Sequence, residues 1–481
     1  MRKWLGLIIT ALLIIVFLPA GLGILAKKSL DRLVADLPMP DGATLTMQDY
    51  TFGWLNSYVA FKIQAPKTPK NAHYVTGETL DIIIHGDIIH GPFVATTRGM
   101  RPGVARVDTH AKLNDLHGLS EKTHQELYLL FKNNDLLHAS SLLQILNGIT
   151  IDLKSSPIQT QLAGDNFQWN GFNAHIKANH DFDKLDTDIT ISPILFTTQS
   201  GATLDAAQGQ YKAQLSREEE SLWVGEQIFT LPTFYLKDEL GAVLRFDHLR
   251  IMSTSNIIHE LLEASLDIEA DNIEVNNQKI EQLRFDVEIS DFANKPVLAL
   301  SKIMHKPQPW SPEDKQQAFK LITQALAPGA NVEIDYHLNM QNEQVVLRGK
   351  LDFPNIKDTV NPNVAVNAQQ LLAGLNAQVE FSAPQPVVSD LLFDMTWSAL
   401  TRQMGTPPGI EEETQVKQLI DNQVQALVQS GAFVVKDNMY NLDFNYQQGN
   451  MLLNAQPVTE GEIFLLLMLL LEVTPDESPL S

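Results

Sequence analysis

The chain has 481 residues, 44% hydrophobic and 19% charged, a globular balance that excludes wholesale disorder and supplies enough apolar side chains for a large core. Its formal net charge of −22 would repel phosphate backbones, so nucleic acid is an unfavourable partner. The absence of cysteine excludes disulfides, Cys-ligated zinc, iron–sulfur clusters and a lipidated cysteine.

The first predicted element is an apolar helix near the start of the sequence. From Leu5 to Ala26 the only polar side chain is Thr10, and these 22 residues would span about 33 Å as a helix, enough for a hydrocarbon core of about 30 Å. Lysines and an arginine flank the run and can reach lipid headgroups. We expect residues 1–28 to form a transmembrane anchor and residues 29–481 to form a β-rich body.

A cleaved signal peptide is the alternative reading of this segment. Its apolar region normally has about 7 to 15 residues and ends in small residues, whereas here the run is longer and Leu18 occupies the third position back from a cut after Ala20. Because basic residues lie on both sides of the run, the positive-inside rule does not determine its orientation in the membrane. The short N-terminal tail favours export of the body.

The body is predicted to be mostly antiparallel sheet, because apolar and polar residues alternate with a period of two. The clearest hairpin pairs Val332–Leu338 with Val345–Phe353 and leaves one face wet. Further alternating runs are Phe172–Ala178, Thr187–Ile191, Gly209–Leu215, Gln227–Leu236, Ala264–Ile268, Leu283–Ile289 and Tyr440–Tyr446. The predicted fold class is therefore mainly β (α+β), a large curved antiparallel sheet with a few packing helices.

Four helices are predicted within the body: His124–Leu146, Pro312–Leu326, Val387–Arg402 and Glu411–Ser430. The last has an apolar stripe at helical spacing, acidic residues at its positive end, and Gly431 where a left-handed cap residue is expected. Near the end, Ile463–Leu471 is a run of apolar residues too short to span a bilayer. A short helix buried against the sheet is favoured there over a plug or a contact with membrane or partner.

Motifs for catalysis or metal binding are not found. The 13 histidines form no H-E-x-x-H or other cluster at ligand spacing, and His85 and His90 fall on opposite faces of an extended chain. No G-x-S-x-G elbow, P-loop or dinucleotide fingerprint occurs. We expect no catalytic residue, cofactor or metal, although a Ser-His-Asp set assembled only in the fold would escape such a search.

Several stretches resemble the YdgA-like envelope proteins of Gram-negative bacteria, a domain family of unknown function. Their Y-x-x-G-W-x-x-S segment is similar to Tyr50, Gly53, Trp54 and Ser57, and their H-G-P motif is similar to His90, Gly91 and Pro92. At the C-terminus the helix leading to Gly431, followed by Gly449 and Asn454, resembles the family pattern, with Ala455 where glycine is usual.

The resemblance implies anchoring in the inner membrane, a periplasmic β body and self-association, and it supplies no catalytic residue. Structural roles are expected for the motif residues, in preference to ligand binding. Gly53 and Gly91 suit turns with positive φ, Pro92 ends a strand, and Trp54 can cover a sheet edge near the membrane.

Two functions from different classes follow. In the first, the sheet offers an apolar groove to lipid or another amphiphile, as in AsmA-like transport proteins of similar layout. In the second, the protein is an envelope scaffold that binds itself or another protein through sheet edges or the 463–471 segment. A hydrolytic enzyme is a third, less favoured reading.

Overall fold

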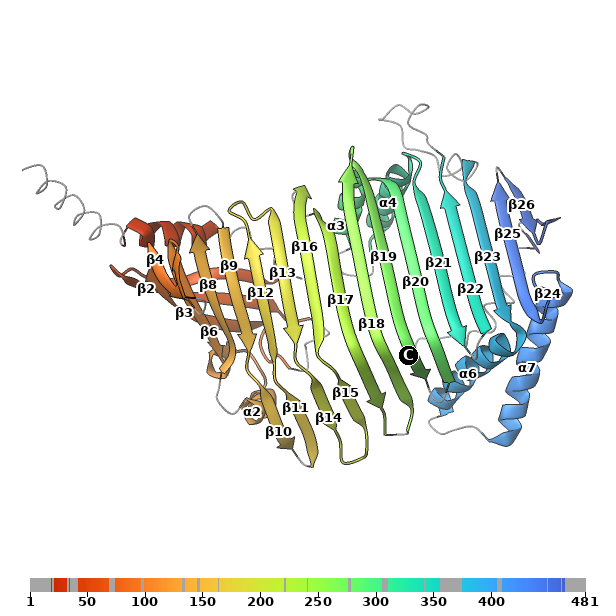
Figure 1. The fold of residues 1–481 in the computed structure, drawn as a ribbon, viewed down its shortest axis with the longest axis horizontal. Coiled ribbons are helices and arrows are strands. Elements are labelled where there is room, and N and C mark those ends of the chain that lie inside the picture. Colours follow the sequence, from red (N-terminus) through yellow and green to blue (C-terminus); the bar gives the residue numbers. More distant parts are fainter. Residues whose placement is uncertain are drawn as a thin grey trace, which may run out of the picture. The chain divides into compact units, whose positions relative to one another are not determined.

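The computed structural model describes residues 19, 21–32, 34, 42–68, 74–96, 99–131, 135–144, 148–162, 164–219, 222–239, 241–275, 278–304, 310–340, 343–354, 374–404, 409–447, 449–459 and 461–462. The chain forms two compact units, Met1–Leu244 and Arg245–Ser481. Each is built on antiparallel strands with helices in a minor role (Figure 1), which confirms the predicted mainly β class.

The first unit contains a meandering antiparallel sheet in which each strand pairs with the next one named. The strands are β1 (Thr44–Thr51), β2 (Asn56–Pro66), β3 (Thr79–His90), β6 (Ala105–Lys112), β8 (Asp135–Gln144), β9 (Gly148–Ser155), β12 (Phe172–Ala178), β13 (Lys184–Ile191), β16 (Gly209–Glu219) and β17 (Leu222–Lys237).

A second row of shorter strands continues this sheet beyond two-residue breaks. It contains β10 (Ile158–Leu162), β11 (Asp165–Trp169), β14 (Ile194–Thr197) and β15 (Thr203–Ala206), and β15 pairs with the far half of β17. Pro157 and Pro193 stand in two of the breaks, and Gly171 with φ 80° stands in another. Proline lacks the amide donor that a ladder needs, so these residues end one strand and let the chain re-aim the next.

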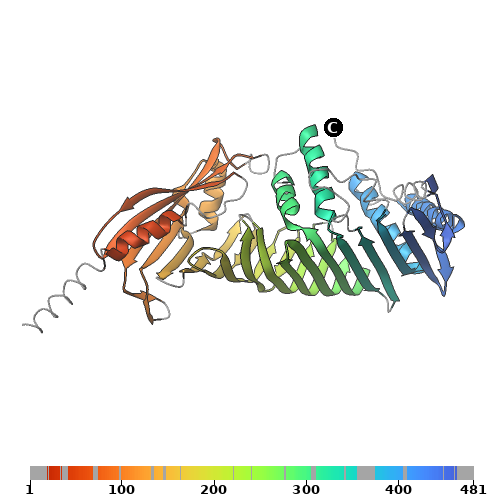
Figure 2. The same ribbon diagram turned by 90° about the horizontal axis from the view of Figure 1, so that it is seen from above.

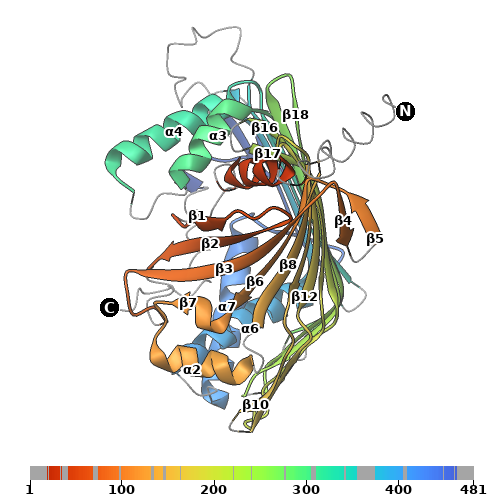
Figure 3. The same ribbon diagram turned by 90° about the vertical axis from the view of Figure 1, so that its left-hand side faces the viewer.

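The smaller elements of this unit are the hairpin β4 (Phe93–Thr96) and β5 (Gly99–Pro102), the 3₁₀ turn η1 (Leu113–Asp115), β7 (Leu116–His117) and α2 (Glu121–Leu130). Figure 3 shows β1–β3 curling over one side of the unit while α2 lies near its lower edge.

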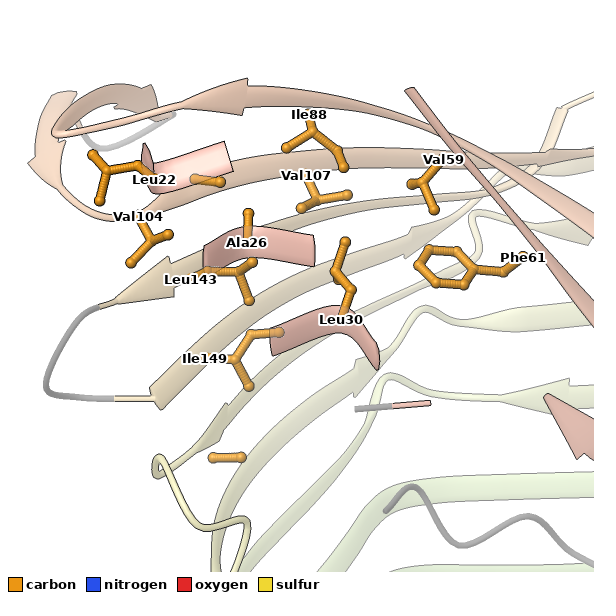
Figure 4. Close-up of a cluster of buried hydrophobic side chains, with 12 residues drawn as sticks. Leu22, Ala26, Leu30, Val59, Phe61, Ile88, Val104, Val107, Leu143 and Ile149 are labelled. Atoms are coloured by element: carbon orange, nitrogen blue, oxygen red, sulfur yellow. The ribbon is translucent and has the colours of Figure 1, made fainter. Parts of the chain in front are cut away.

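The core of the first unit forms around a helix at residues 21–32, called here the N-terminal helix. Its buried residues Leu22, Ala26 and Leu30 recur at a spacing of four and therefore lie on one face. They form one cluster with buried side chains from six strands, including Val59 and Ile88, and Figure 4 shows the helix lying among them. The last part of the predicted anchor is thus packed on the sheet.

No helix in the described part of the chain is long and apolar enough to cross a membrane. Residues 1–18, which hold most of the predicted anchor, lie outside that part, as does the apolar run Ile463–Leu471.

The second unit has a sheet of long antiparallel strands. Successive partners are β19 (Leu261–Val275), β20 (Gln278–Ala293), β21 (Asn331–Met340), β22 (Glu343–Asp352), β23 (Asn376–Pro384), β25 (Met439–Gln447), β26 (Asn450–Leu453) and β27 (Gln456–Pro457), with β24 (Val434–Lys436) also on β25. β18 (Val243–Ile258) precedes β19, and the hydroxyls of Thr254 and Ser265 join these two strands at 2.6 Å.

Among the described residues, four helices stand on one side of this sheet (Figure 2): α3 (Asn294–Met304), α4 (Pro312–Leu326), α6 (Gln385–Met404) and α7 (Ile410–Gln429). The Ser311 hydroxyl caps α4 by accepting from the amide of Asp314 at 3.1 Å, and Pro312 occupies its first turn. Val387 and Val388 of α6 pack on Leu338 and Met340 of the sheet. The stripe Val416, Ile420 and Val424 of α7 packs against α6.

The strands predicted from alternation fall within observed strands, except that Val345–Phe353 extends one residue past the end of β22. The helices α4, α6 and α7 match their predicted ranges to within a few residues. The helix predicted over His124–Leu146 is wrong in its second half. There α2 ends at Leu130 and the segment Asp135–Gln144 is β8, paired with β6 and β9. Its leucine-rich run has no decisive period, so the pairing partners decide its conformation. The helix α3 was not predicted.

Candidate functional site

The motif residues of the first unit come together in one buried hydrogen-bonded cluster, called here the His90 cluster. The Ser57 hydroxyl lies 3.0 Å from Nε2 of His90, and both residues are 5% exposed. Nδ1 of His90 lies 2.9 Å from the carbonyl oxygen of Trp54. Because a carbonyl can only accept, Nδ1 donates to it, and in the neutral imidazole Nε2 then accepts from Ser57. The Ser57 hydroxyl oxygen also accepts from the amide of Gly53 at 3.2 Å.

The His90 cluster holds the N-terminal helix against the sheet. A Cβ built on Gly23 would lie 2.4 Å from the His90 ring, so only glycine allows the helix backbone to rest on the imidazole. The Tyr50 hydroxyl donates to the Gly23 carbonyl at 3.1 Å, and the Lys27 ammonium lies 5.6 Å from the Tyr50 ring centroid. The sequence motifs did not include Gly23, although its place in an apolar helix, where glycine is unfavourable, is a signal of close approach.

The two motif glycines have a different role from the predicted one. Neither Gly53 nor Gly91 has a positive φ. Instead a Cβ on Gly53 would meet the Asn56 carbonyl oxygen at 2.1 Å, and one on Gly91 would meet the Gly103 carbonyl oxygen at 1.8 Å. Both positions therefore require glycine because neighbouring backbone lies against them.

The remaining motif residues near His90 are Pro92 and Trp54. Pro92 is the second residue after the end of β3, close to where it was predicted to end a strand, and the Gly91–Pro92 bond is cis. The Trp54 side chain is 53% exposed, and its backbone carbonyl accepts a hydrogen bond from His90. That its ring covers a sheet edge stays a prediction.

The Ser57–His90 pair has the spacing of a nucleophile and its base. However, the group that orients the imidazole is a backbone carbonyl, and Gly23 lies on the ring. A reacting carbonyl would need a position about 3 Å from the nucleophile, and here the helix fills the space beside the imidazole. The geometry serves packing of the helix.

His85 lies on the opposite face of β3 from His90, as alternation predicts. The Tyr58 hydroxyl bonds to its Nδ1, and its Nε2 lies 3.3 Å from an Asp115 carboxylate oxygen. Burial, followed by the charges of Asp49, Asp87 and Asp115, raises the pKa of Tyr58. No group of three or more histidine or acidic side chains within the described residues could hold a metal ion.

The C-terminal motif residues form a second hydrogen-bonded cluster, within the second unit. The Asn454 amide nitrogen donates to the carbonyls of Gly431 at 2.7 Å and Ala432 at 3.0 Å, and its side-chain oxygen accepts from the Asp443 amide at 2.8 Å. Gly431 has φ 78° after the end of α7, as predicted, and Gly449 has φ 84° in the turn before β26. Asn454 thus ties the end of α7 to the hairpin that follows it.

The second unit also carries a continuous apolar sheet face. Three cross-strand rows run from β19 to β25, and their members alternate with polar neighbours that point to the opposite face. The rows are Leu266, Val287, Ile334, Gly349, Val379 and Phe444; Ile268, Phe285, Tyr336, Leu347, Phe381 and Leu442; and Ala264, Ile289, Val332, Leu351, Ala377 and Tyr446.

This apolar face is only partly covered. α6 and α7 bury one part of it around Phe381, Tyr440 and Leu442, whereas Leu347 is 36% exposed and Val287, Ile334 and Val379 are half-buried. Nearby helices add exposed apolar side chains, among them Phe319, which is 56% exposed. A strip of apolar sheet that the described residues leave partly exposed, bordered by helices, can bury an elongated apolar molecule.

The opposite face of the same sheet is charged. A hollow of about 400 Å³ there is lined by Arg284, Asp286, Glu288, Glu333, Ile334, Asp335, Arg348, Gly349, Lys350, Gln378 and Glu380. Burial, with a hydrogen bond to Asp286, raises the pKa of Asp267. Burial also acts to raise the pKa of Asp286, but hydrogen bonds from Arg284 and Asp267 outweigh it and lower that pKa. A proton is thus favoured on Asp267 over Asp286. One face of the sheet is mainly apolar and the other mainly charged.

A family model described as "Bacterial protein of unknown function (DUF945)" matches residues 1–461. Neither a curated protein nor a solved structure matches the chain.

Proposed function

Because the chain belongs to the bacterial DUF945 family, whose function is unknown, we propose from its architecture that it is a membrane-tethered envelope protein that binds lipid or another amphiphile along its sheet. The observation that carries this proposal is the half-exposed apolar face of β19–β25. An acyl chain laid across those rows would remove apolar surface from water at about 25 cal/mol per Å².

The tether is the apolar run that begins at Leu5. Since Leu22 and Ala26 pack in the core of the first unit, the membrane segment of this proposal is Leu5–Gly21. Those residues would be about 25 Å long as a helix, near the lower end of what a bilayer requires. The resemblance of the motif residues to YdgA-like envelope proteins supports the inner membrane, with the body in the periplasm.

The proposed function is binding without catalysis. The Ser57–His90 pair is covered by the N-terminal helix, and an apolar strip needs no reactive group to hold an amphiphile. No cofactor or metal is part of the proposal, and the net charge of −22 argues against nucleic acid as a partner.

The test compares two substitutions at adjacent positions of β22. Leu347→Glu places a carboxylate on the apolar face, whereas Arg348→Glu places the same group on the charged face, where the Arg348 side chain is 56% exposed. Native mass spectrometry of the full-length protein, gently extracted from membranes, measures co-purifying lipid. We expect wild type and Arg348→Glu to carry lipid and Leu347→Glu to carry about tenfold less, since desolvating a charge costs more than the 1.4 kcal/mol this ratio represents.

Wild-type protein without bound lipid, or equal loss in both variants, would count against amphiphile binding. The same spectra report stoichiometry and so address the second candidate, a self-associating scaffold. That candidate is favoured by β24, a short strand whose Val434 and Val435 are 44% and 47% exposed and which could pair with another chain. Dimers without lipid would support it.

A further inference from the structure

Seven large apolar side chains at one end of the first unit are half exposed or more. They are Ile24 and Leu25 of the N-terminal helix, Phe52, Trp54 and Leu55 of the β1–β2 loop, and Phe93 and Met100 of the β4–β5 hairpin, with exposed fractions from 50% to 65%. This set is called here the apolar patch. Several exposed large apolar side chains in neighbouring segments usually mark a membrane or protein contact.

The three segments of the patch are held together by His90. The Phe52 ring stacks on its imidazole at 5.9 Å, and the Leu55 carbonyl accepts from its backbone amide at 2.8 Å. Gly23 rests on the same ring, and Phe93 follows three residues later at the start of the hairpin. Figure 3 shows β4 and β5 projecting from the sheet. The His90 cluster therefore fixes the relative positions of the segments that carry the patch.

The charge of these segments differs from that of the chain as a whole. The protein has 57 acidic residues in 481, yet none occurs in Met1–Leu30, Tyr50–Gly77 or Ile88–Val107. Lys28 is exposed on the N-terminal helix, and Arg101 lies opposite Val94 in the hairpin. Asp31, Asp49, Asp87 and Asp108 border these segments, and two of them are paired, Asp31 with Lys27 at 3.0 Å and Asp108 with Arg106 at 2.9 Å. Lys28 and Arg101 therefore weaken, near the patch, the repulsion that the net charge of −22 would otherwise produce at anionic headgroups.

We propose that the apolar patch sits in the headgroup region of the bilayer that holds the tether and contacts anionic phospholipid. Exposed aromatic rings beside basic side chains are the composition that favours the membrane interface. The patch also includes Ile24 and Leu25, which follow directly on the end of the proposed membrane segment at Gly21, where the chain enters the folded body. The inference rests on the proposed tether, and it adds that the body is docked on the membrane by a second, rigid contact.

Single-cysteine labelling tests the proposal cleanly, because the natural chain has no cysteine. Spin labels are placed at Phe93 and Met100, and a control label at Tyr128 of α2, which is 56% exposed and outside the patch. The full-length protein is reconstituted in nanodiscs of phosphatidylcholine and phosphatidylglycerol. We expect the labels at 93 and 100 to be several-fold more accessible to oxygen than to a water-soluble nickel chelate, and the label at 128 to show the reverse.

Labels at 93 and 100 that are as open to the nickel chelate as the one at 128 would overturn the proposal. Protection in native membranes but not in nanodiscs would also overturn it, in favour of a protein partner. Extraction with alkaline carbonate separates the two levels of inference. Protein that stays in the membrane with water-exposed labels refutes the patch alone, whereas protein that is released refutes the tether and, with it, the docking.

Discussion

At the residue scale, glycines and one asparagine control how the elements join. Gly23 admits the N-terminal helix to the imidazole of His90, and Gly53 and Gly91 admit neighbouring carbonyls. Asn454 connects three backbone groups around the end of α7. These positions carry little apolar area, so their effect on stability comes from close approach and hydrogen bonds.

Gly23→Ala should destabilise the first unit, by about 1–3 kcal/mol, because the added methyl group collides with the His90 ring. Gly21→Ala is the matched control. Nothing lies within 4 Å of its Cβ, and alanine favours a helix by up to about 1 kcal/mol, so this change should be neutral or slightly stabilising. Urea denaturation followed by circular dichroism measures both, and equal effects of the two changes would contradict the packing argument.

Ala455→Gly should stabilise the second unit by about 1 kcal/mol. Ala455 has φ 63° and Asn454 φ 50°, the left-handed pair of a type I′ hairpin, which costs an alanine about 1 kcal/mol or more. The same change at Ala299, inside α3, should destabilise by a similar amount. Thermal unfolding of the two variants should therefore shift in opposite directions, and a fall in Tm for Ala455→Gly would refute the strain.

At the scale of the elements, adjacent strands are joined by side-chain pairs as well as by the ladder. Asp81 of β3 accepts from Gln64 at 3.1 Å and from Thr79 at 3.0 Å, and it pairs with Lys62 at 2.8 Å. The hydrogen bond from Lys62 is the main cause that holds the pKa of Asp81 below its usual value of 3.8. The ionised carboxylate is thus favoured by the fold.

A lowered pKa gives stability that is present above pH 3.8 and is lost as the pH falls through the lower, folded-state value. Asp81→Asn should therefore cost about 1 kcal/mol at pH 7, and the difference from wild type should shrink below pH 3.8. Asp186→Asn is the control, because its pair with Lys177 spans 3.7 Å and is more than half exposed. Urea denaturation across pH 3–7 provides the curves; a constant difference would show that the carboxylate's charge does not matter.

At the scale of the whole molecule, charge opposes compaction. The chain holds 57 acidic and 35 basic residues, and many of the ion pairs are at the surface, where each contributes little. Self-repulsion of the excess negative charge should therefore outweigh the attraction within those pairs.

Raising the ionic strength from about 0.01 M to about 0.15 M shortens the screening length from about 30 Å to about 8 Å. We expect this change to raise the Tm by about 2–4 °C, equivalent to roughly 1 kcal/mol for units of this size. Differential scanning calorimetry in sodium chloride, with an equal osmolality of glycerol as the control, checks the effect. A Tm that falls with salt would mean that attractive ion pairs dominate.

The sequence by itself determined the class of the fold and many of its elements. Alternation in segments such as Phe172–Ala178 specifies both a strand and its buried face, because side chains on a strand alternate. The helix ending before Gly431 was also predicted, since its stripe and cap are local signals. The motif residues were found through resemblance, and the apolar face was expected as one consequence of the same alternation.

Only the tertiary structure decided which residues meet. Ser57 and His90 are 33 residues apart, and Gly23 joins them from a helix that reads, in sequence, as continuous with a membrane segment. Asp135–Gln144 became a strand because β6 and β9 lie on either side of it. Contacts between distant segments depend on strand register and on the path of the chain, which no local sequence period encodes. The His90 cluster and the apolar patch around it are therefore seen only in the tertiary structure.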